Sequence, residues 1–182
     1  MTRINIPRPR PDPWRNAPLL EAVNKQRGVV PNLMQVLGNS PAALGGYLSL
    51  NGALSKGALG AKTGERIALA IAEINGCGYC LAAHTYLGKN VAKLDDAEIA
   101  ANRDGTSTDS KADAAVRFAA KVARERGHVA DADVQAVKKA GFSDAEVMEI
   151  VVHVARDTLT NYVNEVARTA IDLPAVSLRR AA

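Results

Sequence analysis

Long hydrophobic runs are absent from this sequence of 182 residues. No apolar stretch approaches the roughly 20 residues that a membrane-spanning helix needs, so no membrane partner is expected. The first 14 residues, MTRINIPRPRPDPW, contain no apolar core of the kind found in secretory signals. We therefore predict a cytoplasmic protein.

Aromatic side chains are also scarce, because they make up only 4% of the residues. Alanine is abundant instead, and small side chains let helices approach closely while each buries little area. Association of subunits can supply the missing burial in such a chain. We expect a homo-oligomer.

Strand-like alternation of apolar and polar residues is missing over any useful length, whereas helical patterns fill most of the chain. Capping-box pairs, Asp95 with Glu98 and Ser143 with Glu146, begin two of the predicted helices. Another is predicted to begin at Thr63. The patterns predict an all-α, multi-helix domain over residues 19–182. The predicted helical segments are 40–59, 63–76, 95–104, 110–126 and 143–169.

The first 18 residues form a separate segment that contains five of the eight prolines. The repeat PRPRPDP predicts an extended arm over residues 1–18, and the only tryptophan, Trp14, suggests that the arm docks on the protein. Residues 1–28 carry six basic and two acidic side chains, against a net charge of +4 for the whole chain. Because no aromatic residues interleave with a basic patch, we expect no nucleic-acid partner.

Both cysteines of the chain, Cys77 and Cys80, lie with His84 in the stretch EINGCGYCLAAHTYLG. On a helix these three positions share one face. Asn75-Gly76 ends the preceding helix, so Cys77 is expected at or near the next N-terminus, where backbone N–H groups and the helix dipole favour an anion. Both effects lower the pKa of a thiol, and the thiolate is the nucleophile. His84 follows Cys80 by one turn, within reach for proton exchange.

Three interpretations of this stretch compete: a redox dithiol, half of a zinc site, and two buried cysteines that act as small hydrophobes. A zinc site would use Cys77, Cys80 and His84 but lacks a fourth ligand, since His128 and His153 are isolated. A catalytic site with three ligands and a water is also compatible. The spacing favours the redox pair, and the helix before it argues against a thioredoxin fold, where a strand precedes the motif.

The longer stretch TGERIALAIAEINGCGYCLAAHTYLG resembles the core motif of AhpD-like alkylhydroperoxidases, in the carboxymuconolactone decarboxylase superfamily. That motif has a glutamate, eleven further residues, CxxC, three residues and a histidine, which correspond here to Glu65, Cys77, Cys80 and His84. The ending NYVNEVARTAIDLP, residues 161–174, is similar to that of peroxidase-related members. The resemblance implies an all-α fold and a trimer or hexamer.

Roles for the matching residues follow from the resemblance. Cys80 would attack the peroxide, Cys77 would resolve the sulfenic acid into a disulfide, and His84 with Glu65 would form a proton relay. Tyr79 stands where the prototype enzyme has a second histidine. A phenol donates a hydrogen bond but is a poor base at neutral pH, so Tyr79 is at most a supporting residue.

The expected activity is therefore reduction of small organic hydroperoxides by a thiol peroxidase that needs no cofactor and no metal. Its disulfide would be reduced by an external dithiol, a lipoyl protein or a thioredoxin-like donor. A redox sensor that uses the same dithiol, or a metal-binding protein, is the alternative. Among the other polar residues, His153 is predicted to be solvated surface. Asn161 and Asn164 are predicted to cap or pin a loop, or to line the site.

Overall fold

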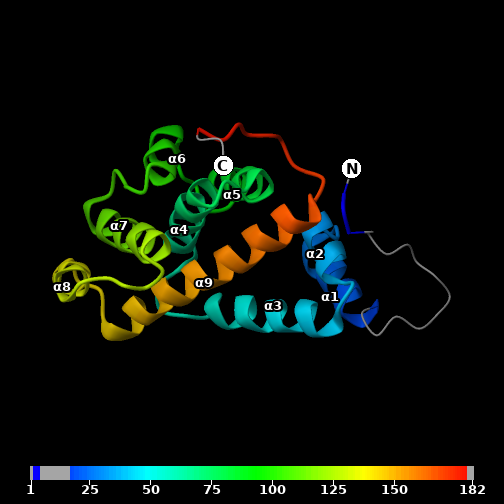
Figure 1. The fold of residues 1–182 in the computed structure, drawn as a ribbon, viewed down its shortest axis with the longest axis horizontal. Helices are drawn as coiled ribbons and strands as arrows, with labels where there is room; N and C mark the ends of the chain where they lie inside the picture. Colours follow the sequence, from blue (N-terminus) through cyan, green and yellow to red (C-terminus); the bar gives the residue numbers. More distant parts are fainter. Residues whose placement is uncertain (1, 5–16, 180–182) are drawn as a thin grey trace.

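The computed structural model describes residues 2–4 and 17–179, and over those residues the chain forms nine helices and no strand (Figure 1). The predicted all-α class is confirmed. In chain order the helices are α1 (Ala17–Arg27), α2 (Asn32–Leu37), α3 (Pro41–Leu54), α4 (Ala61–Ile74), α5 (Gly78–Asn90), α6 (Asp96–Arg103), α7 (Ser110–Arg124), α8 (Asp131–Lys139) and α9 (Asp144–Ala167).

Helix α4 is the centre of the domain. Six successive residues, from Ile67 to Ala72, have no exposed surface, which is expected of a helix that is apolar on every side. The helix packs against α5, α6, α7 and α9. Side chains on the surface of α4 are therefore surrounded by neighbouring helices on several sides.

Helix α9 is the longest helix and crosses the molecule diagonally, with α3 along one side and α4 and α5 along the other (Figure 1). Two clusters of buried side chains lie around these helices. One, built on Leu44, Leu69 and Leu81, contains both cysteines. The other is built on Ile67, Ile150 and the side chains of α7 and α8. Because α4 contributes to both clusters, it connects the cysteine region to the rest of the core.

The helix starts agree only in part with the predicted ones. The capping box of Ser143 and Glu146 is present at α9, which confirms that start. Asp95 caps α6 by accepting from the Glu98 N–H at 2.8 Å, but the Glu98 carboxylate turns inward to Arg66 at 2.6 Å. The predicted start at Thr63 is wrong, because α4 begins at Ala61, after a glycine whose positive φ turns the chain into the helix.

The Glu98 carboxylate is a buried acceptor that holds several segments together. Besides the Arg66 guanidinium it accepts hydrogen bonds from Asn102, from the Ser107 hydroxyl and from both the backbone and the hydroxyl of Thr108. Burial opposes the charge, yet these hydrogen bonds lower the pKa of Glu98 to about 2. Glu98 is therefore a structural anion that fixes the loop between α6 and α7 onto α4.

The two ends of the described chain both return to the helical body. The predicted arm, residues 1–18, lies outside the described residues over 5–16, Trp14 included, and α1 already begins at Ala17. The Arg3 N–H donates to the Ala167 carbonyl at the end of α9. Beyond α9, the segment 168–179 runs back over the domain, and the Arg179 N–H donates to the Glu73 carboxylate at 2.6 Å. Among the described helices, none is long and apolar enough to cross a membrane.

Candidate active site

The turn between α4 and α5 places the two cysteines. Gly76 has a φ of 66°, which turns the chain at the end of α4 and lets the Cys77 N–H donate to the Ala72 carbonyl. Cys77 is the N-cap of α5, and its Sγ accepts a hydrogen bond from the Cys80 N–H at 3.3 Å. The sulfur of Cys77 thus occupies the position at which a helix N-terminus holds a capping acceptor.

The two thiols are free and buried, and their pKa values are shifted in opposite directions. Cys77 has no exposed surface and Cys80 only 2%. A hydrogen bond from the Cys77 thiol, helped by the charge of His84, lowers the pKa of Cys80 to about 7 despite burial. The same hydrogen bond, together with burial, raises the pKa of Cys77. As the pH rises through neutrality the pair therefore loses its first proton from Cys80, which becomes the thiolate, while Cys77 keeps its proton.

Glu65 on α4 and His84 on α5 form an ion pair, with 2.8 Å between Glu65 Oε2 and His84 Nδ1. Burial disfavours the imidazolium, but the Glu65 carboxylate outweighs burial and raises the pKa of His84 to about 9. The two side chains are 21% and 17% exposed, whereas Cys80 is almost fully buried. The pair is therefore more accessible to solvent than the reactive sulfur is. Because α4 begins at Ala61, Glu65 lies in the second turn of the helix. The helix dipole favours acidic residues mainly in the first turn, so it does not account for a glutamate at this position.

Helix α9 completes the site with polar residues, of which the sequence analysis named Asn161 and Asn164 as able to line it but did not single out Asp157. Asp157, Asn161 and Asn164 are at most 2% exposed and share one face of the helix. Asn164 Nδ2 donates to Cys80 Sγ at 3.2 Å. The Asn161 amide also lowers the pKa of Cys80, while its Oδ1 accepts from Asn75 Nδ2 at 2.9 Å. The signal in the sequence was this spacing of three short polar side chains along one face of a long helix.

Asp157 adds a buried carboxylate beside His84. Its Oδ1 accepts from Nε and Nη2 of Arg156 at 2.9 and 2.6 Å. Burial raises the pKa of Asp157, and the charges of Arg156 and His84 only partly offset that effect. The imidazolium of His84 is thus flanked by two carboxylates, one partly exposed and one buried.

Tyr79 lies between the cysteines in sequence, yet its hydroxyl is engaged elsewhere. It accepts a hydrogen bond from the Leu33 N–H of α2 at 3.3 Å. Burial raises the pKa of Tyr79, and the carboxylate of Asp172 beside it acts in the same direction. The phenol therefore ties α5 to α2 and to the C-terminal segment, which is a structural task.

The prediction for His153 is wrong. Its side chain is 5% exposed and packs on Gly64 of α4, where an added Cβ would come within 2.9 Å of the imidazole Cε1. Burial and the charge of Arg156 lower the pKa of His153 to about 4. Gly64, 89 positions away in the sequence, leaves the space that the ring occupies. The residues around His153 in the sequence therefore could not predict its burial. His128, by contrast, is exposed.

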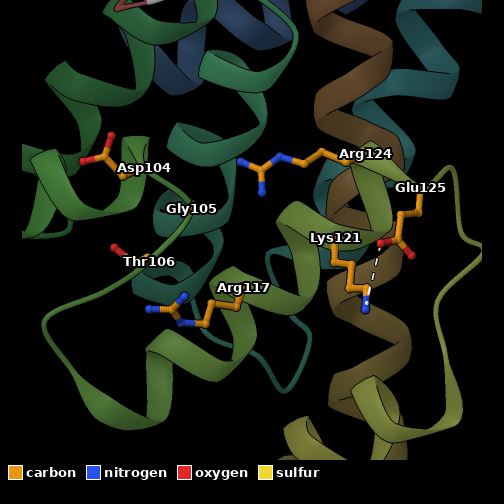
Figure 2. Close-up of a pocket in the computed structure, with 7 residues that line it drawn as sticks. All are labelled: Asp104, Gly105, Thr106, Arg117, Lys121, Arg124 and Glu125. Atoms are coloured by element: carbon orange, nitrogen blue, oxygen red, sulfur yellow. Dashed lines mark ion pairs between the residues drawn. The ribbon is translucent and has the colours of Figure 1, made fainter.

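Two other features were considered as sites. Within residues 2–4 and 17–179, no group of three or more His, Cys, Asp or Glu side chains could hold a metal ion. A surface hollow of about 340 Å³ lies between α7 and the turn that follows α6 (Figure 2). Charged side chains line it, among them Arg117 and Lys121, which form ion pairs with Asp113 and Asp133. None of its lining residues belongs to the dithiol site.

Fold and site together define a class: an all-α protein with a buried dithiol at a helix N-terminus. Residues 41–125 match the carboxymuconolactone decarboxylase family. No curated protein matches the chain. Among solved structures, the alkylhydroperoxidase AhpD core of an uncharacterized peroxidase-related protein from Ralstonia eutropha JMP134 is 25% identical, with 94% of this chain and 92% of that one covered and a TM-score of 0.81.

Two further structures share the fold. An uncharacterized peroxidase-related protein from Silicibacter sp. TM1040 is 22% identical over 93% of this chain and 91% of its own, with a TM-score of 0.81. The debrominase Bmp8, solved as a cysteine-to-alanine variant with 2,3,4-tribromopyrrole, is 18% identical over 94% and 92%, with a TM-score of 0.74. The match over residues 41–125 and the likeness of the whole fold make this chain similar to proteins of the AhpD and carboxymuconolactone decarboxylase superfamily.

Proposed function

We propose that the protein is a thiol peroxidase that reduces small organic hydroperoxides through Cys77 and Cys80. The observation that carries the proposal is the state of the dithiol: Cys80, with a pKa of about 7, is hydrogen-bonded by a thiol partner and lies near the His84 imidazolium. A nucleophilic thiolate, a resolving thiol and a proton donor are the three groups that the reaction needs.

In the first step the Cys80 thiolate attacks the distal oxygen of the hydroperoxide. The sulfur–oxygen bond forms as the oxygen–oxygen bond breaks, so the sulfur is oxidised to a sulfenic acid and the peroxide is reduced to an alkoxide. The His84 imidazolium gives its proton to the alkoxide, which leaves as the alcohol. Glu65 stabilises the imidazolium before the step and holds the ring in place through Nδ1.

In the second step the Cys77 sulfur attacks Cys80. The disulfide forms, the sulfur–oxygen bond breaks, and the hydroxide that leaves takes up the Cys77 proton as water. An external dithiol then reduces the disulfide by exchange and is itself oxidised. We propose a lipoyl protein or a thioredoxin-like donor for this role, because both offer paired thiols that can complete the exchange.

We also propose that the protein works as a homo-oligomer, a trimer or a hexamer. The outer face of α9 carries Leu159, Tyr162 and Val166, which are 40%, 60% and 63% exposed and lie on one side of the helix. An apolar face of this kind is unusual on a monomer and suits a second copy of the chain. Light scattering of the purified protein tests this: a monomer at micromolar concentration would contradict it.

An aromatic bromide is a second class of electrophile that a dithiol reduces by two electrons. The likeness to a debrominase suggests attack of Cys80 on a bromine atom, with the aromatic carbon taking a proton and the disulfide forming as bromide leaves. The polar groups that act on Cys80, two asparagine amides and the charge of His84, suit a small polar peroxide better than a flat halogenated ring.

Turnover assays separate these functions. The reduced protein is mixed with tert-butyl hydroperoxide or with tribromopyrrole in the presence of reduced lipoamide or thioredoxin, and loss of the electrophile is followed. We expect catalytic loss of the hydroperoxide and none in the Cys80→Ser variant. Stoichiometric oxidation without turnover under any reductant would favour a redox sensor. Turnover of tribromopyrrole alone would favour the debrominase activity.

A further inference from the structure

Three buried polar atoms on the α9 face at the dithiol have no hydrogen-bond partner: Asp157 Oδ2, Asn161 Nδ2 and Asn164 Oδ1. Each belongs to a residue that is at most 2% exposed. An unsatisfied buried polar group costs on the order of 1–3 kcal/mol, so three of them in one place call for an explanation.

The two asparagines hold Cys80 from the same side. The other half of the Asn164 amide donates to Cys80 Sγ at 3.2 Å, so its free Oδ1 lies within one amide group of the sulfur. The other half of the Asn161 amide is fixed by Asn75, which leaves Nδ2 as the end directed at the reactive region. An acceptor without a partner, Asn164 Oδ1, is therefore held next to the nucleophile, together with a donor, Asn161 Nδ2, that faces the sulfur and lowers its pKa but makes no hydrogen bond of good geometry.

A hydroperoxide matches this pair of atoms. Its terminal O–H is one donor, and both of its oxygens carry acceptor lone pairs, whereas a simple alkyl halide such as iodomethane has no such donor. We propose that Asn161 and Asn164 form the peroxide-binding site of this protein, in which Asn164 Oδ1 accepts the peroxide O–H and Asn161 Nδ2 donates to a peroxide oxygen. This rests on the proposed function, because it assigns the substrate to the same dithiol.

The pair places the distal oxygen on the Cys80 sulfur with the leaving oxygen free to turn toward His84. In the step described above the peroxide O–H hydrogen stays on the oxygen that becomes the sulfenic acid, so Asn164 Oδ1 keeps its donor throughout. Asn161 Nδ2 faces the oxygens on which negative charge grows, and a donor in that position strengthens its bond in the transition state.

The experiment compares two reagents on the same thiol. Reduced wild type, Asn161→Ala and Asn161→Asp are each reacted with tert-butyl hydroperoxide and with iodomethane at pH 8, and loss of the Cys80 thiol is timed by mass spectrometry. Iodomethane has no hydrogen-bonding group and needs only the thiolate, so the ratio of the two rate constants cancels changes in the pKa of Cys80 and in the folded fraction. The Asp variant keeps an acceptor for Asn75 and replaces the Nδ2 donor by a second oxygen, and the effect of its charge on the pKa of Cys80 also cancels in the ratio.

The expected result is a rate ratio about 100-fold lower in both Asn161 variants, the lower end of the range for loss of a transition-state donor. Asn102→Ala is the matched control, because Asn102 is a fully buried asparagine with an unpartnered Oδ1 whose amide bonds Glu98 and the Thr106 carbonyl. Its ratio should equal that of the wild type. An unchanged ratio in the Asn161 variants overturns the binding site but leaves the peroxidase intact, whereas a wild type that reacts only with iodomethane overturns both.

Discussion

Replacing Glu65 by glutamine keeps the shape of the side chain and removes the charge that supports the His84 imidazolium. The pKa of His84 is about 9 against an ordinary 6.5, and the Glu65 carboxylate is the main group that raises it. Without that charge, only the weaker effects of Asp157 and Cys80 oppose burial, and the pKa falls toward the ordinary value. At pH 8 the imidazolium fraction then drops from about nine-tenths to about 3%, a loss of roughly 30-fold, while at pH 6 the same change costs less than about twofold.

The pH at which activity falls reports whether the Glu65 carboxylate supports the His84 imidazolium. Activity of the wild type rises as Cys80 ionises through about pH 7 and falls as His84 loses its proton through about pH 9. In Glu65→Gln the falling limb should move to about pH 6.5 or lower. The assay is the second-order rate of peroxide reduction between pH 5.5 and 10, with the imidazole resonance of His84 followed by NMR over the same range.

A matched variant separates the specific effect from loss of a negative charge in general. Glu125→Gln removes an exposed carboxylate on α7, at the far hollow, and should leave both limbs in place. If Glu65→Gln keeps a falling limb near pH 9 and full activity at pH 8, the carboxylate does not control His84 and the reasoning fails.

Three further predictions concern stability. Gly64→Ala should lower the free energy of unfolding, measured by urea titration, by about 1–3 kcal/mol because the added methyl group meets the buried His153 ring. In the control Gly52→Ala the new Cβ has open space around it, so the free energy of unfolding should rise by about 0.5–1 kcal/mol. Glu98 stabilises the fold above its ordinary pKa of 4.5 and loses that effect as the pH falls toward 2, so Glu98→Gln should flatten the acid limb of a melting-temperature profile between those values. Ser143→Ala should cost about 1 kcal/mol through the lost α9 cap, and an unchanged melting temperature would show that the cap is replaced by solvent.

Local patterns predicted the parts of this protein that depend on neighbours in sequence. The cap at Ser143 and the turn before Cys77 each involve residues within three or four positions, and both are present. The spacing of Cys77, Cys80 and His84 likewise placed them on one helix. The start of α4 was misplaced by two residues because Gly60, with its positive φ, begins the helix without a side-chain cap.

The rest of the site depends on contacts between distant segments, which no local pattern reports. Asn164 reaches Cys80 across 84 positions. His153 looked polar and exposed by its neighbours, but Gly64 leaves a space that buries its ring. Asp157 carries no sequence mark beyond its helical spacing from the asparagines, and its importance comes from burial beside His84.

The central claim is that Cys80 is the attacking sulfur and Cys77 resolves it, and one mass-spectrometric experiment tests it most directly. Reduced wild type and the Cys77→Ser and Cys80→Ser variants receive one equivalent of tert-butyl hydroperoxide in the presence of dimedone. We expect an internal disulfide in the wild type, a dimedone adduct on Cys80 in Cys77→Ser, and unmodified protein in Cys80→Ser. An adduct on Cys77 in Cys80→Ser, with none on Cys80 in the other variant, would contradict the assignment of the nucleophile.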